Sequence, residues 1–367
     1  MKNNHVTILQ IDLNAVSFNL NYFKSKLQKN TKVLAVVKAF GYGSDAIEIA
    51  KHIQSGVSYF AVAYSDEGIA LRDAGIHTPI LVLHPQISNL QLIIDRCLEP
   101  NLYNFSILNR FIELTEAQKL NDYPIHIKFN TGLNRLGFKP NEVNSIAEKV
   151  NATNSVKITS IFSHLAASED KKEYDFSLNQ ISLFKNLSSE FERKLDYKPM
   201  LHMCNTSGVV NFPEAHFDMV RLGIGLYGFG NENSVTNDLK NVITLKSVIS
   251  QIHTINKGES VGYNRSFIAD TKIKTATIPI GHADGISRKL GNGIGFVTIN
   301  NQKASIVGNV CMDMIMVDIT TIDCNAGDEV VIFDNQQTIE ELSKNYDTIP
   351  YELITAISQR IKRQIKC

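Results

Sequence analysis

The chain has 367 residues, of which 43% are hydrophobic and 20% are charged, and its 37 basic residues balance its 37 acidic residues. This composition is typical of a globular protein of about two domains, and a net charge of zero gives no general attraction to nucleic acid or acidic membranes. No apolar run approaches the ~20 residues that span a bilayer, and residues 1–13 lack the apolar core of a signal peptide. The sequence therefore predicts neither a nucleic-acid partner nor a membrane association.

The cysteines are scattered and form no Cys-x-x-Cys pair: Cys97, Cys204, Cys311, Cys324 and Cys367. This spacing argues against a zinc site and against a disulfide framework. It fits the reducing environment of the cytoplasm. We therefore expect a cytoplasmic protein without a metal centre.

The first two-thirds of the chain alternate between short apolar runs and helical stretches. Apolar residues recur at helical spacing over residues 13–27 and 178–195, and Ser65 and Gly75 are candidate caps of a helix between them. Near-continuous apolar runs are typical of parallel strands buried on both faces. Strands each followed by a helix indicate a (β/α)₈ barrel. The predicted strands cover residues 33–37, 59–63, 80–83, 98–102, 125–129, 158–162, 200–204 and 218–222.

After about residue 236 the pattern changes to antiparallel strands separated by Gly and Asn turns. Short helices are predicted at residues 339–345 and 351–358. The sequence thus predicts an α/β protein with a barrel domain at 1–236 and a mainly antiparallel β domain at 237–367. The strands predicted in the second domain cover residues 242–255, 272–280, 295–300, 304–310, 315–319 and 329–333.

Active sites of such barrels lie at the carboxyl ends of the strands. Lys38 directly follows the first predicted strand, and a desolvated lysine flanked by cations loses basicity and can form a Schiff base. Position alone equally allows a lysine that reaches solvent at the barrel rim. The loops after the last two strands bind phosphate in many barrels. Polar residues that follow the strands are Tyr42, His84, Lys128, Arg135, His164, Asn205, Thr206, Ser207 and Arg221.

Five stretches in both predicted domains carry a resemblance to a known family. They are AVVKAFGYG at 35–43, KFNTGLNRLG at 128–137, DMVRLGIGLYG at 218–228, PIGHADGISR at 279–288 and GNVCMDMIMVD at 308–318. In this order, and with shorter elements around Tyr263 and Tyr351, they resemble the alanine racemases. These are fold-type-III enzymes that depend on pyridoxal 5′-phosphate (PLP), and the resemblance covers essentially the whole chain.

The resemblance implies a mechanism with two bases. Lys38 resembles the lysine that holds PLP as an internal aldimine and exchanges the α-proton on one face, and Tyr263 resembles the base of the opposite face. Racemisation needs a base on each side of a planar carbanion. His164 and Arg221 resemble the hydrogen-bonded pair that supports the tyrosine. Arg221 would also contact the pyridine nitrogen, where a cation opposes ring protonation.

The resemblance also implies residues that bind the cofactor and the substrate. Arg135 would contact the cofactor and the substrate carboxylate, and the Met312 backbone N–H would help to hold that carboxylate, with Asp313 nearby in the substrate site. Lys128 resembles a lysine that is carbamylated in many members, although an unmodified lysine stays an alternative. The cofactor cradle would consist of Tyr42, Asn205, Thr206, Gly223, Ile224 and Tyr351.

The family further implies a homodimer with shared active sites, and a role in supplying D-alanine for peptidoglycan. Phe40-Gly41, Asn130 and His282 depart from the usual family pattern, and Thr206 stands where serine is common. The departures at Asn130 and His282 leave racemisation of serine, or of a broader set of amino acids, as an alternative. A PLP carrier protein built on a similar barrel is the alternative that is not an enzyme.

Overall fold

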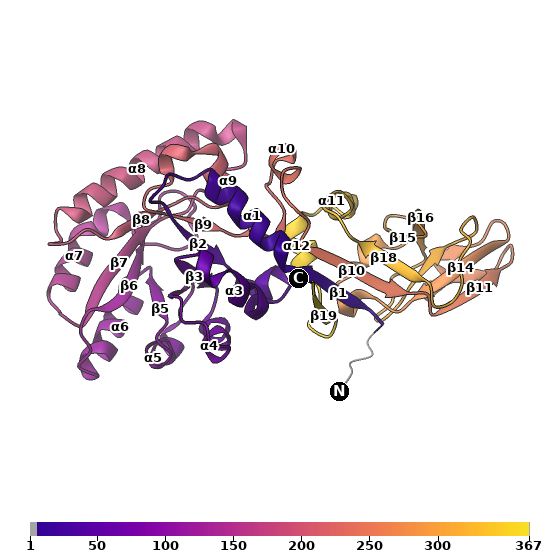
Figure 1. Cartoon of the computed structure of the whole chain (residues 1–367), viewed down its shortest axis with the longest axis horizontal. Coiled ribbons are helices and arrows are strands. Elements are labelled where there is room, and N and C mark those ends of the chain that lie inside the picture. The colour runs from indigo at the N-terminus through magenta and orange to yellow at the C-terminus, as the bar shows by residue number, and fades with distance from the viewer. Residues whose placement is uncertain (1–5, 367) are drawn as a thin grey trace.

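The computed structural model describes residues 6–366. Cys367 lies outside the described residues, and so do residues 1–5, the start of the segment for which no signal peptide is predicted. Figure 1 shows two parts side by side, a barrel surrounded by helices and an elongated sheet. Within residues 6–366 no helix is long and apolar enough to cross a membrane.

The first part is a closed barrel of parallel strands, as predicted. Each strand coincides with one of the eight predicted apolar runs, because burial on both faces demands such runs. The strands, in their order around the barrel, are β2 (Lys32–Val36), β3 (Tyr59–Val62), β4 (Ile80–Val82), β5 (Glu99–Leu102), β6 (Tyr123–Lys128), β7 (Val156–Phe162), β8 (Met200–His202) and β9 (Met219–Leu222).

Helices cover the outside of the barrel, but the last strand lacks a long helix of its own. β9 leads into a short turn at Ile224–Tyr227, and α1 (Leu13–Ser25), which precedes the first barrel strand, packs against that turn. The apolar face of α1 predicted from its spacing is buried. The helices after the other strands are α2 (Lys38–Tyr42), α3 (Ala46–Ile53), α4 (Ser65–Asp73), α5 (Leu90–Asp95), α6 (Phe105–Ala117), α7 (Val143–Asn151), α8 (Tyr174–Glu192) and α9 (Thr206–Asn211).

The caps predicted for α4 are each displaced by one position. Ser65 is the first helical residue, and Tyr64 is the cap, because the Glu67 carboxylate accepts the Tyr64 backbone N–H at 3.3 Å. At the other end Ala74 is the cap, and Gly75 follows it with a φ of +86°. The carboxylate at the third helical position thus bonds to the N–H of the cap residue, which is the glutamate half of a capping box.

The second part is a nine-stranded, mainly antiparallel sheet. The single strand predicted over 242–255 is two strands, because its first half pairs with residues 329–333 and its second half with residues 273–278. The strands, in sheet order, are β11 (Gln251–Ile255), β14 (Ile273–Ile278), β17 (Ile315–Asp318), β16 (Gln302–Val307), β15 (Phe296–Ile299), β18 (Glu329–Phe333), β10 (Ile243–Val248), β1 (Ile8–Asp12) and β19 (Lys362–Lys366).

Short elements complete this part of the chain. A two-stranded ribbon of β12 (Ser260–Val261) and β13 (Phe267–Ile268) flanks Tyr263. The helices are α10 (Asn233–Thr236), α11 (Gln336–Asn345) and α12 (Pro350–Thr355), and the last two match the predicted helices.

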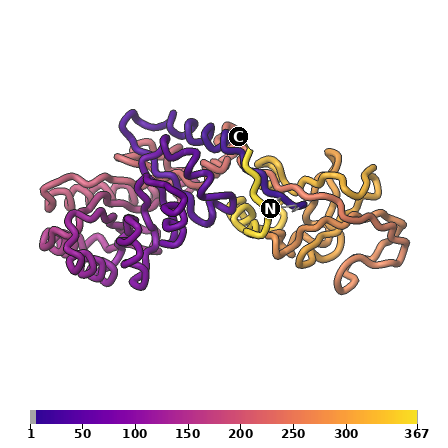
Figure 2. Tube along the Cα trace, turned by 60° about the horizontal axis from the view of Figure 1, so that its bottom comes forward, coloured from indigo at the N-terminus to yellow at the C-terminus, as the bar shows by residue number. Residues whose placement is uncertain are grey.

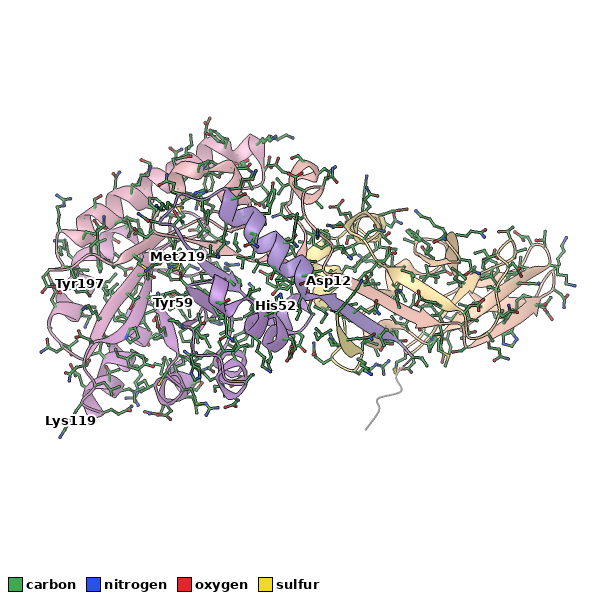
Figure 3. The ribbon with its side chains drawn as sticks, viewed as in Figure 1. Asp12, His52, Tyr59, Lys119, Tyr197 and Met219 are labelled. Carbon is green, nitrogen blue, oxygen red and sulfur yellow. The ribbon has the colours of Figure 1, made fainter. Side chains whose placement is uncertain are left out.

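Both described ends of the chain meet in the sheet. β1 pairs with β10 on one side and runs parallel to β19 on the other, so the N-terminal strand belongs to the sheet rather than to the barrel. Figure 2 shows these two segments side by side. The Asp12 carboxylate accepts the backbone N–H of Ala15 at 2.9 Å and caps α1, so strand and helix follow each other without a loop. Figure 3 places Asp12 between the two parts and Tyr59 within the barrel.

Candidate active site

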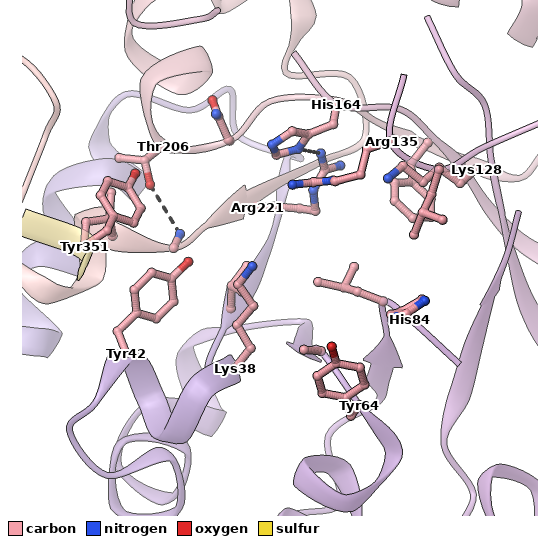
Figure 4. A pocket seen from close by; sticks show the side chains of 18 residues that line it. Lys38, Tyr42, Tyr64, His84, Lys128, Arg135, His164, Thr206, Arg221 and Tyr351 are labelled. Atoms are coloured by element: carbon pink, nitrogen blue, oxygen red, sulfur yellow. Dashed lines mark hydrogen bonds between the residues drawn. The ribbon is translucent and has the colours of Figure 1, made fainter. Parts of the chain in front are cut away.

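A cavity of about 510 Å³ lies at the carboxyl ends of the barrel strands, where the sequence predicted the site. Its volume lies within the range of small-molecule sites. Figure 4 shows the side chains that line it. The structure brings together eleven of the predicted site residues here: Lys38, Tyr42, Lys128, Arg135, His164, Asn205, Thr206, Arg221, Gly223, Ile224 and Tyr351.

Lys38 opens a short turn with a left-handed backbone. Ala39, Phe40 and Gly41 have φ angles of 52°, 55° and 65°. A residue with a side chain in this conformation costs roughly 1–2 kcal/mol, and such conformations persist where their surroundings hold them, often at functional sites. Here the Glu67 carboxylate accepts the backbone N–H of Ala39 at 2.6 Å. The turn therefore fixes the point from which the Lys38 side chain enters the cavity.

The second part of the chain packs directly against this turn. Arg363 of β19 donates to the carbonyl oxygen of Gly43 at 2.8 Å and to that of Ser44 at 3.1 Å. A Cβ atom at Gly43 would lie 2.0 Å from the carbonyl oxygen of Ile354, so only glycine allows this approach. The contact brings α12, and with it Tyr351, to the barrel mouth.

One wall of the cavity consists of hydroxyl groups and backbone N–H groups. The Thr206 hydroxyl oxygen accepts from the backbone N–H groups of Gly223 and Gly225, each at 3.3 Å. A Cβ atom at Gly223 would lie 2.4 Å from the Tyr42 hydroxyl oxygen, so the absence of a side chain keeps this space open. The Tyr351 hydroxyl accepts from the Asn231 amide at 3.2 Å. Converging hydroxyl and backbone N–H groups suit a phosphate.

The opposite wall is strongly cationic. Lys38, Lys128, Arg135 and Arg221 all line the cavity, and none of the described lining residues is a carboxylate. Burial, and then the charge of Arg135, lowers the pKa of Lys38. Burial, with the charges of Arg135 and Arg221, lowers the pKa of Lys128 to about 7. An anionic ligand would relieve this concentration of positive charge.

Arg221 is buried and donates in several directions. Its Nη1 lies 2.7 Å from Nδ1 of His202, and its Nη2 lies 2.9 Å from Nδ1 of His164. Its Nη2 also donates to the carbonyl oxygens of Ser163 and Met203. Burial lowers the pKa of Arg221 to about 10, so the guanidinium remains charged at neutral pH. Because a guanidinium only donates, Nε2 carries the proton of neutral His164.

Three predicted site residues lie elsewhere in the chain. Tyr263, Met312 and Asp313 line a separate hollow of the second part. The Tyr263 side chain is 72% exposed, and Met312 is 59% exposed. Asp313 accepts a hydrogen bond from Arg360 at 2.6 Å. Within one chain, therefore, the two predicted bases do not share a cavity.

Two residues that depart from the family pattern lie outside the cavity lining. The Asn130 amide oxygen accepts the backbone N–H groups of Gly132 and Asn134, so it shapes the loop that carries Arg135. His282 is exposed. Sequence reasoning missed His202 and Glu67, which support Arg221 and the Lys38 turn. A histidine inside an otherwise apolar strand was the available signal for His202.

The structure combines a parallel barrel, a lysine of lowered pKa after the first barrel strand, and a phosphate cradle in the same cavity. This combination is that of a barrel enzyme that holds PLP on a lysine. The family model for the N-terminal domain of alanine racemases matches residues 11–230, and that for the C-terminal domain matches residues 242–365. The chain therefore belongs to the alanine racemase family, and its activity is the PLP-dependent racemisation of alanine.

Individual relatives match along almost the entire chain. Alanine racemase from Halothermothrix orenii is 36% identical over 98% of this chain and 97% of its own length. Alanine racemase from Treponema denticola is 35% identical, with 96% of each chain covered. Because the match includes the second domain, the alternative of a PLP carrier built on the barrel alone is not supported.

Solved structures give the same result. Alanine racemase from Bartonella henselae, with covalently bound pyridoxal phosphate, superposes with a TM-score of 0.88 at 30% identity, over 98% of this chain and 99% of that one. Alanine racemase from Bacillus anthracis, with bound L-Ala-P, superposes with a TM-score of 0.92 at 26% identity, over 100% of this chain and 96% of that one.

Proposed function

We propose that this chain interconverts L-alanine and D-alanine by moving the α-proton between two bases, Lys38 and Tyr263 of the partner subunit. The observation that carries the proposal is the position of the Lys38 amine in the cavity. The same cavity contains the hydroxyl cradle, and none of its described lining residues is a carboxylate. Bound PLP would withdraw electrons from the α-carbon of the amino acid and so acidify its hydrogen. The lowered pKa of Lys38 leaves more of its amine unprotonated at neutral pH, the form that can accept a proton.

Residues of this chain would hold the cofactor at both ends. Tyr42, Thr206 and Tyr351, with the backbone N–H groups of Gly223 and Ile224, would bind the phosphate, and Asn205 would support them by capping α9. Arg221 would donate to the pyridine nitrogen. A fixed cation at this position opposes protonation of the ring.

The substrate carboxylate would be held by charge and by a backbone N–H group. Arg135 would approach it from the barrel side and the Met312 backbone N–H of the partner subunit from the other side, with Asp313 of the partner subunit nearby. The exposed Arg135 side chain is free to turn toward an arriving carboxylate. Closure by a second subunit would exclude water from the reacting atoms and leave space for a small amino acid only.

We infer a homodimer from the position of Tyr263. A tyrosine that is 72% exposed, next to exposed Met312 and Met314, forms a patch of the kind that protein interfaces cover. A twofold dimer would bring each patch to the partner's barrel mouth and create two equivalent sites. In this arrangement residues 1–236, together with Tyr351 of α12, supply the cofactor site, and Tyr263 within residues 237–367 supplies the second base.

Lys128 is proposed to carry a carbamate. With a pKa of about 7 a substantial fraction of its amine is unprotonated at neutral pH, and only the unprotonated amine reacts with CO₂. The resulting anion would stand among the cations that lower that pKa, Arg135, Arg221 and Lys38. It would therefore orient Arg135 by an ion pair.

The test of the function is direct. The purified protein is incubated with PLP and single L-amino acids, and the products are separated on a chiral column. D-alanine should dominate, and equal conversion of serine would favour the broader racemase. We further propose a cytoplasmic enzyme that supplies D-alanine for peptidoglycan, a proposal supported by the scattered cysteines, of which Cys97, Cys204, Cys311 and Cys324 are free.

A further inference from the structure

A buried chain of hydrogen bonds runs from Arg221 through the barrel interior, from strand to strand. Nη1 of Arg221 lies 2.7 Å from Nδ1 of His202, and Nε2 of His202 lies 2.9 Å from the Ser160 hydroxyl. That hydroxyl lies 2.6 Å from Nδ1 of His126, and Nε2 of His126 lies 2.7 Å from a carboxylate oxygen of Glu99. The five residues stand on β9, β8, β7, β6 and β5, which are consecutive neighbours in the barrel.

With both histidines neutral, the two ends of this chain fix the direction of every hydrogen bond in it. A guanidinium only donates, so Nδ1 of His202 accepts and its Nε2–H donates to Ser160. The Ser160 hydroxyl then donates to Nδ1 of His126, whose Nε2–H donates to Glu99. An ionised carboxylate only accepts, so both ends impose the same order. A guanidinium at one end and a carboxylate at the other leave the two histidines one tautomer each.

Among the described residues, the three inner side chains of this chain, His126, Ser160 and His202, have no hydrogen-bond partner outside it. His126, Ser160 and His202 are each 0% exposed. The His202 ring stacks on Phe162, with ring centroids 4.7 Å apart and planes 5° from parallel. At the far end Tyr59 lies near Glu99, and burial, with the neighbouring Glu99 carboxylate, raises the pKa of Tyr59. A buried polar group that loses its partner has no water to replace it, so one break would disturb its neighbours.

We propose that Glu99, His126 and Ser160, acting through His202, are positioning residues that fix the Arg221 guanidinium toward the pyridine nitrogen of the cofactor. Among the described contacts of Arg221, Nη1 has the His202 ring as its hydrogen-bond partner, whereas Nη2 has three partners. If Nη2 were its only anchor, the planar guanidinium could still turn about that atom. The second hydrogen bond, at Nη1, fixes the orientation of the guanidinium plane. The inference rests on the proposed contact between Arg221 and the cofactor.

The first experiment compares two buried serines near one strand. Ser160→Ala breaks the chain at its centre, and Ser155→Ala is the matched control, because buried Ser155 bonds to Thr115 at 2.9 Å outside the chain. Each apoprotein is titrated with PLP, and the circular dichroism band of the bound cofactor is recorded. Ser160→Ala should weaken PLP binding roughly tenfold and alter the band, whereas Ser155→Ala should do neither. Equal effects of the two variants would overturn the proposal.

A double-mutant cycle tests whether the effect passes through Arg221. In an Arg221→Gln background, Ser160→Ala should change PLP affinity much less than in the wild type. If the two substitutions instead weaken PLP binding by factors that simply multiply, Ser160 acts only on the general structure. If Ser160→Ala fails to fold, as judged by thermal unfolding of the apoprotein, the nearly isosteric Glu99→Gln takes its place in the cycle.

The same cycle separates this inference from the proposed function. If Arg221→Gln alone leaves PLP affinity and the dichroism band unchanged, the contact between Arg221 and the cofactor is wrong, and the inference falls with it. If Arg221→Gln has a large effect but Ser160→Ala behaves like Ser155→Ala, the contact stands and only the positioning chain is wrong.

Discussion

The Arg221 guanidinium donates a hydrogen bond to Nδ1 of His164 across 2.9 Å. The pair joins a residue that is always charged to one that is kept neutral, because burial and the charge of Arg221 lower the pKa of His164 well below its usual 6.5. His164 therefore presents a single N–H at Nε2 over the working pH range. This relationship leads to a prediction about stability.

The apoprotein should lose stability as the pH falls below about 6.5. Unfolded His164 takes up a proton there, while the folded residue does not, so the unfolded state binds more protons and stability rises with pH. The slope should approach at most ~1.4 kcal/mol per pH unit for this residue. Urea unfolding at pH 5.5 and 7.5 measures it, and His164→Gln should reduce the difference. An unchanged difference in the variant would assign the pH dependence to other groups.

Reductive trapping should label Lys38. Borohydride treatment of the protein loaded with PLP, followed by peptide mapping, should place the cofactor on the peptide that contains Lys38, since this amine opens the strained turn at the cavity. Lys38→Ala should retain its fold and lose both the label and the yellow colour. A label on Lys128 instead would reverse the assigned roles of the two lysines.

The hydroxyl of Thr206 should matter more than its shape. Thr206→Ser keeps the oxygen that faces the N–H groups of Gly223 and Gly225 and should barely change the affinity for PLP. Thr206→Val keeps the shape, removes the hydroxyl, and should weaken binding by roughly 1–2 kcal/mol. Titration of the apoproteins with PLP checks both. Equal affinities for serine and valine variants would remove Thr206 from the phosphate cradle.

Lys128 should form a carbamate in bicarbonate at pH 8. Because its pKa is about 7, most of the amine is unprotonated at this pH. ¹³C-labelled bicarbonate should give a carbamate signal in the NMR spectrum that Lys128→Met abolishes. The control Lys157→Met, at an exposed position of β7, should leave the signal in place. A signal that persists in Lys128→Met would locate the carbamate elsewhere.

Mixed dimers should recover activity from two inactive parents. Lys38→Ala and Tyr263→Phe should each be nearly inactive. In a heterodimer one site combines the intact Lys38 with the intact Tyr263 of the partner subunit, and the other site carries both lesions. With random exchange about half the dimers are mixed, so activity should approach about a quarter of wild type. Absence of recovery, with subunit exchange shown by mass spectrometry, would mean that Tyr263 serves its own chain.

The barrel and its cavity were predictable because local signals marked them. Apolar runs identified the strands, and residues immediately after a strand, such as Lys38 and His164, meet at one end of any parallel barrel. The roles of Tyr263 and Met312 rested on motif resemblance alone, since they lie in a separate hollow.

Other features depend on partners far away in the sequence. β1 and β19 were not predicted as neighbours because their pairing joins residues more than 350 positions apart. The left-handed turn after Lys38 depends on Glu67 and Arg363, and no local pattern announces either contact. The positioning chain behind Arg221 likewise needs five strands in register before its members meet.

The pairing of β1 between β10 and β19 also decides how the gene could be divided. A fragment that ends near residue 236 would carry β1 without either of its neighbours, and its unpaired edges would promote aggregation. The remaining fragment would have a gap in its sheet at the same position. If the chain is cut near residue 236, each piece should be insoluble or unstable alone. The first piece carries β1, and the second carries the gap between β10 and β19 that β1 fills, so together they should behave as a split protein. The barrel and the sheet differ in architecture, but because they share the segment of β1 and α1 we expect them to fold as a single unit.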